Sequence, residues 1–155
     1  MERKLRIYID SSVIGGCYDD EFKEWSNQLI DEFKSGLHIP VISELIQAEI
    51  SSAPQEIQNV LRELLDCHCE ILLETEESLE LAQQYIASAI LPKKFENDAR
   101  HIAVATINNV NMLVSWNFRH IVHFEKIQQF NSVNIKEGYK TIEIYSPREV
   151  INYDV

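Results

Sequence analysis

Hydrophobic and polar residues along this chain follow two alternating periods. Short runs with a two-residue period predict β-strands, and longer runs whose apolar residues recur every three or four positions predict helices. We expect five strands, at residues 5–9, 38–42, 68–73, 112–115 and 141–145. We expect helices between them, at residues 20–35, 44–51, 54–65, 76–90, 98–109 and about 120–129, and a last turn at 147–151. Strands that alternate with helices predict an α/β domain with a mostly parallel sheet covered on both faces.

Residues that favour helix ends support these boundaries. Ser43 and Asn97 can cap helices with their side chains, and Pro54 suits a first helical turn. Gly36 and Pro92 follow helical runs that they are suited to end.

The length and composition are those of one acidic domain, which we expect to span residues 1–155. The 25 Asp and Glu outnumber the 14 Lys and Arg, which gives a net charge of −11. Broad, non-specific nucleic-acid binding requires a basic surface, so this charge argues against it. The charge does not argue against an enzyme that reaches phosphate groups through bound cations.

Cysteine usage and hydropathy predict a cytoplasmic protein. No apolar stretch has the roughly 18 residues of a membrane-spanning helix, and the run after Arg3 and Lys4 is too short for a secretory leader. The three cysteines are an odd number, so we expect free thiols in a reducing compartment. Cys67 and Cys69 lack a second pair at zinc-finger spacing, and we expect them to be buried thiols.

The first expected strand runs directly into Asp10, Ser11 and Ser12. In open parallel sheets, ligands bind beyond the carboxyl ends of the strands, which is where Asp10 lies. An aspartate at this position also suits a turn or a helix cap, so the residue alone leaves both interpretations open. Ser12 is placed to steady the Asp10 carboxylate.

Two acids compete on the helix that begins after Ser43. Glu44 lies in its first turn, where a carboxylate complements the helix dipole. Glu49 shares the apolar stripe of Leu45 and Ile46, and a carboxylate buried there needs a cation or a hydrogen-bond partner. We therefore favour Glu49 over Glu44 as a functional acid, with a side chain that extends to solvent as the alternative.

Asp98 opens a helix whose small, apolar body can pack on the sheet, so its carboxylate is expected at the exposed mouth. First-turn acids are common in helices, and that simpler interpretation stays open. His101 lies one turn further on, either as a packing residue or as a partner of the site.

The fourth strand leads into further polar residues. Asn117 can offer an amide oxygen, donate to a bound phosphate or shape a turn. Ser115 can order the neighbourhood. Arg119 and His120 are the local candidates for contact with a phosphate or with its leaving oxygen.

Three converging carboxylates repel one another unless they are protonated or bridged by a cation. A site built from oxygen ligands suits Mg²⁺ or Mn²⁺ rather than zinc. One or two such ions, held by Asp10, Glu49 and Asp98, can bind a phosphodiester, lower the pKa of an attacking water and stabilise the leaving oxygen.

Four segments that carry these residues resemble the PIN-domain family, in particular the VapC-type toxin nucleases and their stand-alone relatives. The segments are YIDSSVI with Asp10, PVISELIQAEI with Glu49, NDARHIAVAT with Asp98, and LVSWNFRHI with Asn117. They occur in the order typical of the family and span residues 5–124.

The resemblance implies a three-layer α/β/α fold and an Mg²⁺- or Mn²⁺-dependent endoribonuclease, often a homodimer. It implies that Asp10, Glu49 and Asp98 bind metal and that Asn117 occupies a fourth, usually acidic, catalytic position. It also implies RNA as substrate and, for toxin members, a small antitoxin protein that occupies the acidic groove.

Two other classes of protein are alternatives. A weakly active or inactive binding module with the same fold is compatible with the amide at Asn117 and with the net charge. A phosphatase with an aspartyl nucleophile expects a second Asp where Ser12 stands. A phosphoacceptor receiver expects an acid after the third strand and a Lys after the fifth, and neither is clearly present.

Overall fold

The structure is a computed structural model that describes residues 4–152. Its centre is a five-stranded sheet in the order β3-β2-β1-β4-β5, and every neighbouring pair of strands is parallel. The strands are β1 (Arg6–Ile9), β2 (Ile39–Ser43), β3 (Glu70–Leu72), β4 (Met112–Val114) and β5 (Ile144–Tyr145). The prediction of an α/β domain with about five mostly parallel strands is confirmed.

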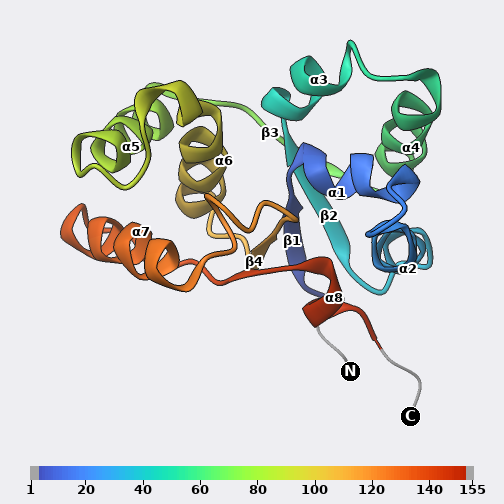
Figure 1. The fold of residues 1–155 in the computed structure, drawn as a ribbon. Coiled ribbons are helices and arrows are strands. Elements are labelled where there is room, and N and C mark those ends of the chain that lie inside the picture. Colours follow the sequence, from blue (N-terminus) through green and yellow to red (C-terminus); the bar gives the residue numbers. More distant parts are fainter. Residues whose placement is uncertain (1–3, 153–155) are drawn as a thin grey trace.

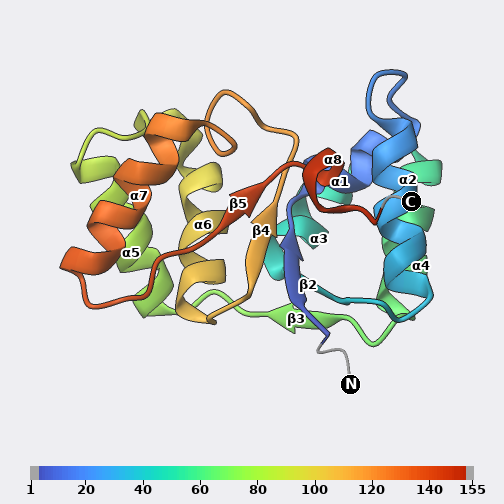
Figure 2. The same cartoon turned by 90° about the horizontal axis from the view of Figure 1, so that it is seen from below.

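Helices cover both faces of the sheet and make three layers (Figures 1 and 2). One face carries α5 (Glu76–Ala87), α6 (Glu96–Ile107) and α7 (Phe124–Lys136). The other face is covered by five helices: α1 (Ser11–Gly15), α2 (Lys23–Lys34), α3 (Glu44–Ile50), α4 (Gln55–Leu65) and α8 (Pro147–Val150). Two 3₁₀ turns, Gly16–Tyr18 and Lys93–Phe95, complete the regular structure.

Side chains of the pleated sheet alternate between two apolar clusters. Tyr8, Val41 and Leu113 pack under α5, α6 and α7, whereas Ile7 and Ile9 pack under the opposite helices. This alternation follows from the two-residue period of a strand, which sends successive side chains to opposite faces. No helix within residues 4–152 is long and apolar enough to cross a membrane.

Three element boundaries differ from the prediction because side chains bond to the backbone. Helix α1 was not expected; the Asp10 side chain caps it by accepting from the Ser12 amide at 3.2 Å. Helix α7 begins at Phe124 rather than near residue 120, because Asn117 holds the following residues in turns. Strand β5 is short because the Asn131 side chain takes both the amide and the carbonyl of Ile142.

Two predicted helix caps behave differently from the expectation. Ser43 does precede α3, but its hydroxyl bonds to Tyr8 Oη at 2.8 Å and makes no capping bond. Asn97 is not a cap, because the turn at Lys93–Phe95 leads directly into a helix that begins at Glu96.

The three cysteines are free, as expected, but only Cys17 is buried. Cys67 and Cys69 lie in the connection between α4 and β3 and are half-buried, so the expectation that both are buried is wrong. Burial raises the pKa of the Cys17 thiol to about 11 and that of the Cys69 thiol to about 12.

These raised pKa values predict selective thiol labelling. A thiol far below its pKa is protonated and reacts slowly. With a chromogenic disulfide reagent at pH 8, we expect Cys67 to react first and Cys17 and Cys69 to stay unmodified while the protein is folded. Peptide mapping by mass spectrometry identifies the labelled thiols. Equal labelling of all three in the folded protein would contradict the burial described here.

Candidate functional site

Asp10 lies where β1 ends and is held by hydroxyl groups from two segments. The residue is buried, with only 5% of its surface exposed. Ser12 Oγ donates to Oδ1 at 2.6 Å, and Ser115 Oγ, which follows β4, donates to Oδ2 at 2.6 Å. The same hydroxyls accept from the amides of Trp116 and Asn117, both at 2.9 Å. The loop after β4 and the Asp10 carboxylate are therefore fixed to one another.

The surroundings of Asp10 raise its pKa. Burial disfavours the charged carboxylate most, and the negative charge of Asp98 adds to this effect. The charge of His101 and the hydroxyls of Ser115 and Ser12 oppose it without cancelling it. Asp10 is therefore a carboxylate whose ionised form gains from a nearby cation.

Asp98 is joined to the loop after β4 through a second pair of contacts. Asn117 Nδ2 donates to Asp98 Oδ2 at 3.3 Å, and His120 Nδ1 lies 3.0 Å from the same oxygen. Asn117 Oδ1 is already engaged, because it accepts from the His120 amide at 2.9 Å. Asn117 thus positions the loop and donates to Asp98, and a carboxylate at residue 117 would repel Asp98 instead.

Glu49 reaches the site through a buried chain of hydrogen bonds. Its Oε1 lies 2.7 Å from His101 Nε2, and His101 Nδ1 lies 2.6 Å from Tyr8 Oη. Tyr8 Oη in turn bonds to Ser43, so strands β1 and β2 and helices α3 and α6 meet at His101. His101, only 2% exposed, connects the elements that carry Asp10, Glu49 and Asp98.

The charge environment of His101 favours its protonated form. Burial pushes the pKa of the imidazole down, but the hydrogen bond that it donates to Glu49 and the charges of Asp10, Glu49 and Asp98 push it up. The net shift is upward. The two ring nitrogens are both occupied, so His101 holds Glu49 in place and is not free to rotate.

The two acids of α3 have different surroundings. Glu44 turns away and accepts from the Glu74 amide at 2.9 Å. Glu49 is not buried on the apolar stripe, where only Leu45, Ile46 and Ile50 are buried, and its side chain is 29% exposed. The sequence left open a partnered acid or a side chain that extends to solvent, and in the structure Glu49 is partly exposed with His101 as its hydrogen-bond partner.

Arg119 does not touch the acids. It is exposed, and its guanidinium carbon lies 5.8 Å from the centre of the Phe95 ring. Phe95, which no pattern in the sequence singled out, packs in a tilted arrangement against His120, with the ring centres 4.0 Å apart. Tyr8 was also missed, although its position two residues before Asp10 puts both on the same face of β1.

The oxygen donors at the strand ends have the chemistry that Mg²⁺ and Mn²⁺ prefer. Within residues 4–152, Glu49 Oε2 and Asp98 Oδ1 accept no hydrogen bond, which leaves an oxygen on each acid for a ligand. In the same residues, no three His, Cys, Asp or Glu side chains are spaced to bind one metal ion. The donor types fit a divalent cation such as Mg²⁺, which usually binds through one or two carboxylates and keeps several waters.

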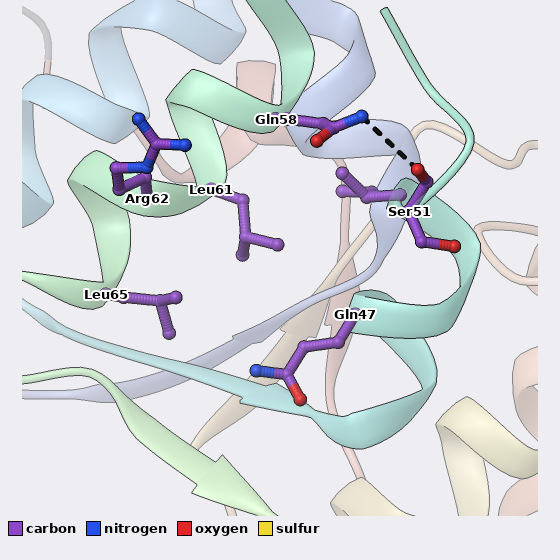
Figure 3. Close-up of a pocket in the computed structure, with 7 residues that line it drawn as sticks. Gln47, Ser51, Gln58, Leu61, Arg62 and Leu65 are labelled. Carbon is purple, nitrogen blue, oxygen red and sulfur yellow. Dashed lines mark hydrogen bonds between the residues drawn. The ribbon is translucent and has the colours of Figure 1, made fainter. Parts of the chain in front are cut away.

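A separate cavity lies between α3 and α4 (Figure 3). Its volume is about 270 Å³. None of the predicted site residues lines it, and its walls include Gln47, Ser51, Gln58, Leu61, Arg62 and Leu65. The cavity therefore lies apart from the acids at the strand ends.

No family model and no curated protein matches this sequence. Solved structures do match: nine chains resemble this one in fold. One belongs to the crystal structure of VapBC2 from Rickettsia felis bound to a DNA fragment from their promoter. The match has a TM-score of 0.58 and covers 92% of this chain and 98% of that chain. This chain has the PIN fold. At 14% identity the likeness concerns the fold, and it confirms the resemblance at that level.

The PIN fold accounts for the placement of the acids. Asp10 follows the central strand β1, Glu49 lies on the helix after β2, and Asp98 lies on the helix before β4. Because β1 lies between β2 and β4, the three acids come from neighbouring elements. The three acids can therefore lie near the same end of the sheet although they are far apart in the sequence.

Proposed function

We propose that the protein is a cytoplasmic, divalent-metal-dependent endoribonuclease and the toxin of a toxin–antitoxin pair. The observation that carries this proposal is the link of Asp10, Glu49 and Asp98 through one buried histidine and one loop. The PIN fold supports it, because Asp10, Glu49 and Asp98 lie on elements that adjoin the neighbouring strands β1, β2 and β4.

In this proposal Asp10, Glu49 and Asp98 hold Mg²⁺ or Mn²⁺. The bound ion would polarise the phosphodiester and lower the pKa of the attacking water. Ser12 and Ser115 keep the Asp10 carboxylate in one orientation, and His101 does the same for Glu49. His120 lies beside Asp98, where its imidazole can donate a proton to the leaving oxygen.

Partner proteins follow from the same proposal. The structural neighbour was solved as VapBC2, which supports a small antitoxin as the partner of this chain. We also propose a homodimer, as the family resemblance implies. Native mass spectrometry of the purified chain tests the dimer, and a monomer at micromolar concentration would contradict it.

The second candidate is a binding module that acts through protein contacts. It is favoured by the lack of three suitably spaced metal ligands within residues 4–152 and by the engaged amide of Asn117. Calorimetry with Mn²⁺ separates the two proposals. Heat of binding together with a rise in Tm supports the nuclease, and absence of both supports the binding module.

A matched pair on α3 tests the nuclease directly. Glu49→Gln removes a charge from the proposed site, whereas Glu44→Gln removes a charge from a side chain that accepts from the Glu74 amide. We expect Glu49→Gln to lower Mn²⁺-dependent cleavage of a fluorescent RNA by at least about 10-fold and Glu44→Gln to leave it unchanged. Equal activity of the two variants would contradict the proposed role of Glu49.

A further inference from the structure

Aromatic and cationic side chains border the acids. We call Lys94, Phe95, Phe118 and Arg119 the aromatic–cationic rim. Lys94 Nζ lies 5.1 Å and the Arg119 guanidinium 5.8 Å from the centre of the Phe95 ring. Phe118, next to Arg119 in the chain, is 49% exposed. The rim therefore combines flat apolar rings with positive charge at the surface.

The rim is connected to the acids by two short routes. The Phe95 ring packs against His120 with the ring centres 4.0 Å apart, and His120 contacts Asp98. Phe118 follows Asn117, whose side chain donates to the same Asp98. A nucleotide next to a phosphate at the acids would thus meet the rim.

Phe118 has a rigid backing. Its ring lies 6.1 Å from the ring of Trp116 and 6.4 Å from that of Phe22. Those two rings stack at 4.1 Å, and Trp116 Nε1 donates to buried Ser26 at 2.8 Å. A half-exposed ring on a packed base offers stacking area without the entropic cost of ordering a loose side chain.

The cations of the rim are not neutralised by the protein. Within residues 4–152, neither Lys94 nor Arg119 forms an ion pair with a carboxylate, although acids outnumber bases. Both are held over an aromatic ring instead. These two unpaired cations lie beside the site proposed to bind phosphate. Their charge is complementary to that of a polyanion.

We propose that the aromatic–cationic rim binds single-stranded RNA, with a base stacked on Phe118 and phosphates held by Lys94 and Arg119. The inference rests on the proposed function, because it assigns the substrate surface of the same acid site. Bases in a duplex are already stacked on their neighbours, so the rim selects unpaired RNA. A few local cations suffice for this binding, which reconciles it with a net charge of −11.

Equilibrium binding without metal tests the rim independently of cleavage. The probe is a fluorescein-labelled single-stranded RNA of about 12 nucleotides, measured by fluorescence anisotropy in EDTA with the full chain. We expect Phe118→Ala to weaken binding by about 5- to 100-fold and Phe118→Trp to retain it, because stacking accepts any aromatic ring. Lys94→Ala should reduce the slope of log Kd against log salt concentration by about 0.7, the loss of one phosphate contact to a single strand.

Two control variants remove similar groups from α7, outside the rim. Ile135→Ala removes an exposed apolar side chain of α7, and Lys136→Ala removes an exposed cation from the same helix. Both should bind the RNA like the wild type. Unchanged Tm for Phe118→Ala would show that its effect is on binding, since half of that side chain already faces solvent.

Three results would overturn the proposal: tight binding by Phe118→Ala, equal affinity for a hairpin duplex and the single strand, or no RNA binding by the wild type. The experiments distinguish failure of the RNA-binding proposal from failure of the nuclease proposal. If wild type cleaves RNA with Mn²⁺ while Phe118→Ala binds normally, the rim is wrong and the nuclease stands. If Phe118-dependent binding occurs without any cleavage, the rim stands and the nuclease is wrong.

Discussion

Replacing Asp98 with asparagine should reduce Mn²⁺-dependent RNA cleavage by at least about 100-fold while leaving the fold intact. Asparagine keeps the shape of the side chain and an acceptor oxygen for Asn117 and His120, both of which contact Asp98 Oδ2. It removes the charge that would hold the cation, and loss of such a ligand costs more than the 10- to 100-fold typical of its supporting partners. Asp10→Asn should have an effect of the same size.

The measurement is the initial rate of cleavage of a fluorescent reporter RNA over a series of Mn²⁺ concentrations. Asp31→Asn, on the exposed surface of α2, makes the same chemical change away from the site. Its rate should equal that of the wild type. Full activity in Asp98→Asn with an unchanged Tm would show that the acid cluster does not perform the reaction.

The largest effect on stability is expected for Gly16→Ala. A Cβ atom at residue 16 would lie 2.5 Å from Ser26 Oγ and 2.8 Å from Trp116 Nε1, which are hydrogen-bonded to each other at 2.8 Å. Ser26 also donates to the Val13 carbonyl, and both side chains are buried, so neither can move without loss of a bond. Overpacking of this kind costs about 1–3 kcal/mol of the free energy of unfolding.

The adjacent residue supplies the control for this variant. Gly15 has helical backbone angles, and nothing lies within 4 Å of a Cβ built on it. Gly15→Ala should therefore leave stability unchanged or raise it by up to about 1 kcal/mol, since alanine favours a helix. Urea unfolding followed by circular dichroism compares the two. Equal midpoints for Gly15→Ala and Gly16→Ala would contradict the close packing at Trp116.

The regular periodicity of the strands made the sheet predictable. Elements whose bounds depend on hydrogen bonds between side chains and backbone were not predictable. Strand β1 alternates clearly, and its position was found to within a residue. Helix α1 has only five residues, too few for a helical period, and exists because Asp10 caps it. The late start of α7 depends on bonds from Asn117 that no local pattern reveals.

The sequence indicated which residues form the candidate site, but not how their side chains are arranged. The rule that ligands lie beyond strand ends selects Asp10 and Asn117 without any coordinates. The preference for Glu49 over Glu44 rested on helical position, and the structure turns Glu44 toward the Glu74 amide. The role of His101 as the link between Tyr8 and Glu49 could not be predicted from the sequence. It depends on contacts with Glu49 and Tyr8, which lie 52 and 93 residues away in the chain.

The central position of β1 has a consequence for the synthesis of this protein on the ribosome. One neighbour of β1 is formed by residue 43, but the other, β4, comes only at Met112–Val114. One of the two hydroxyls that hold Asp10 belongs to Ser115, which lies 105 positions downstream. A nascent chain that ends before β4 therefore has all three acids and no assembled site. The arrangement of these acids can therefore form only after most of the domain has left the ribosome.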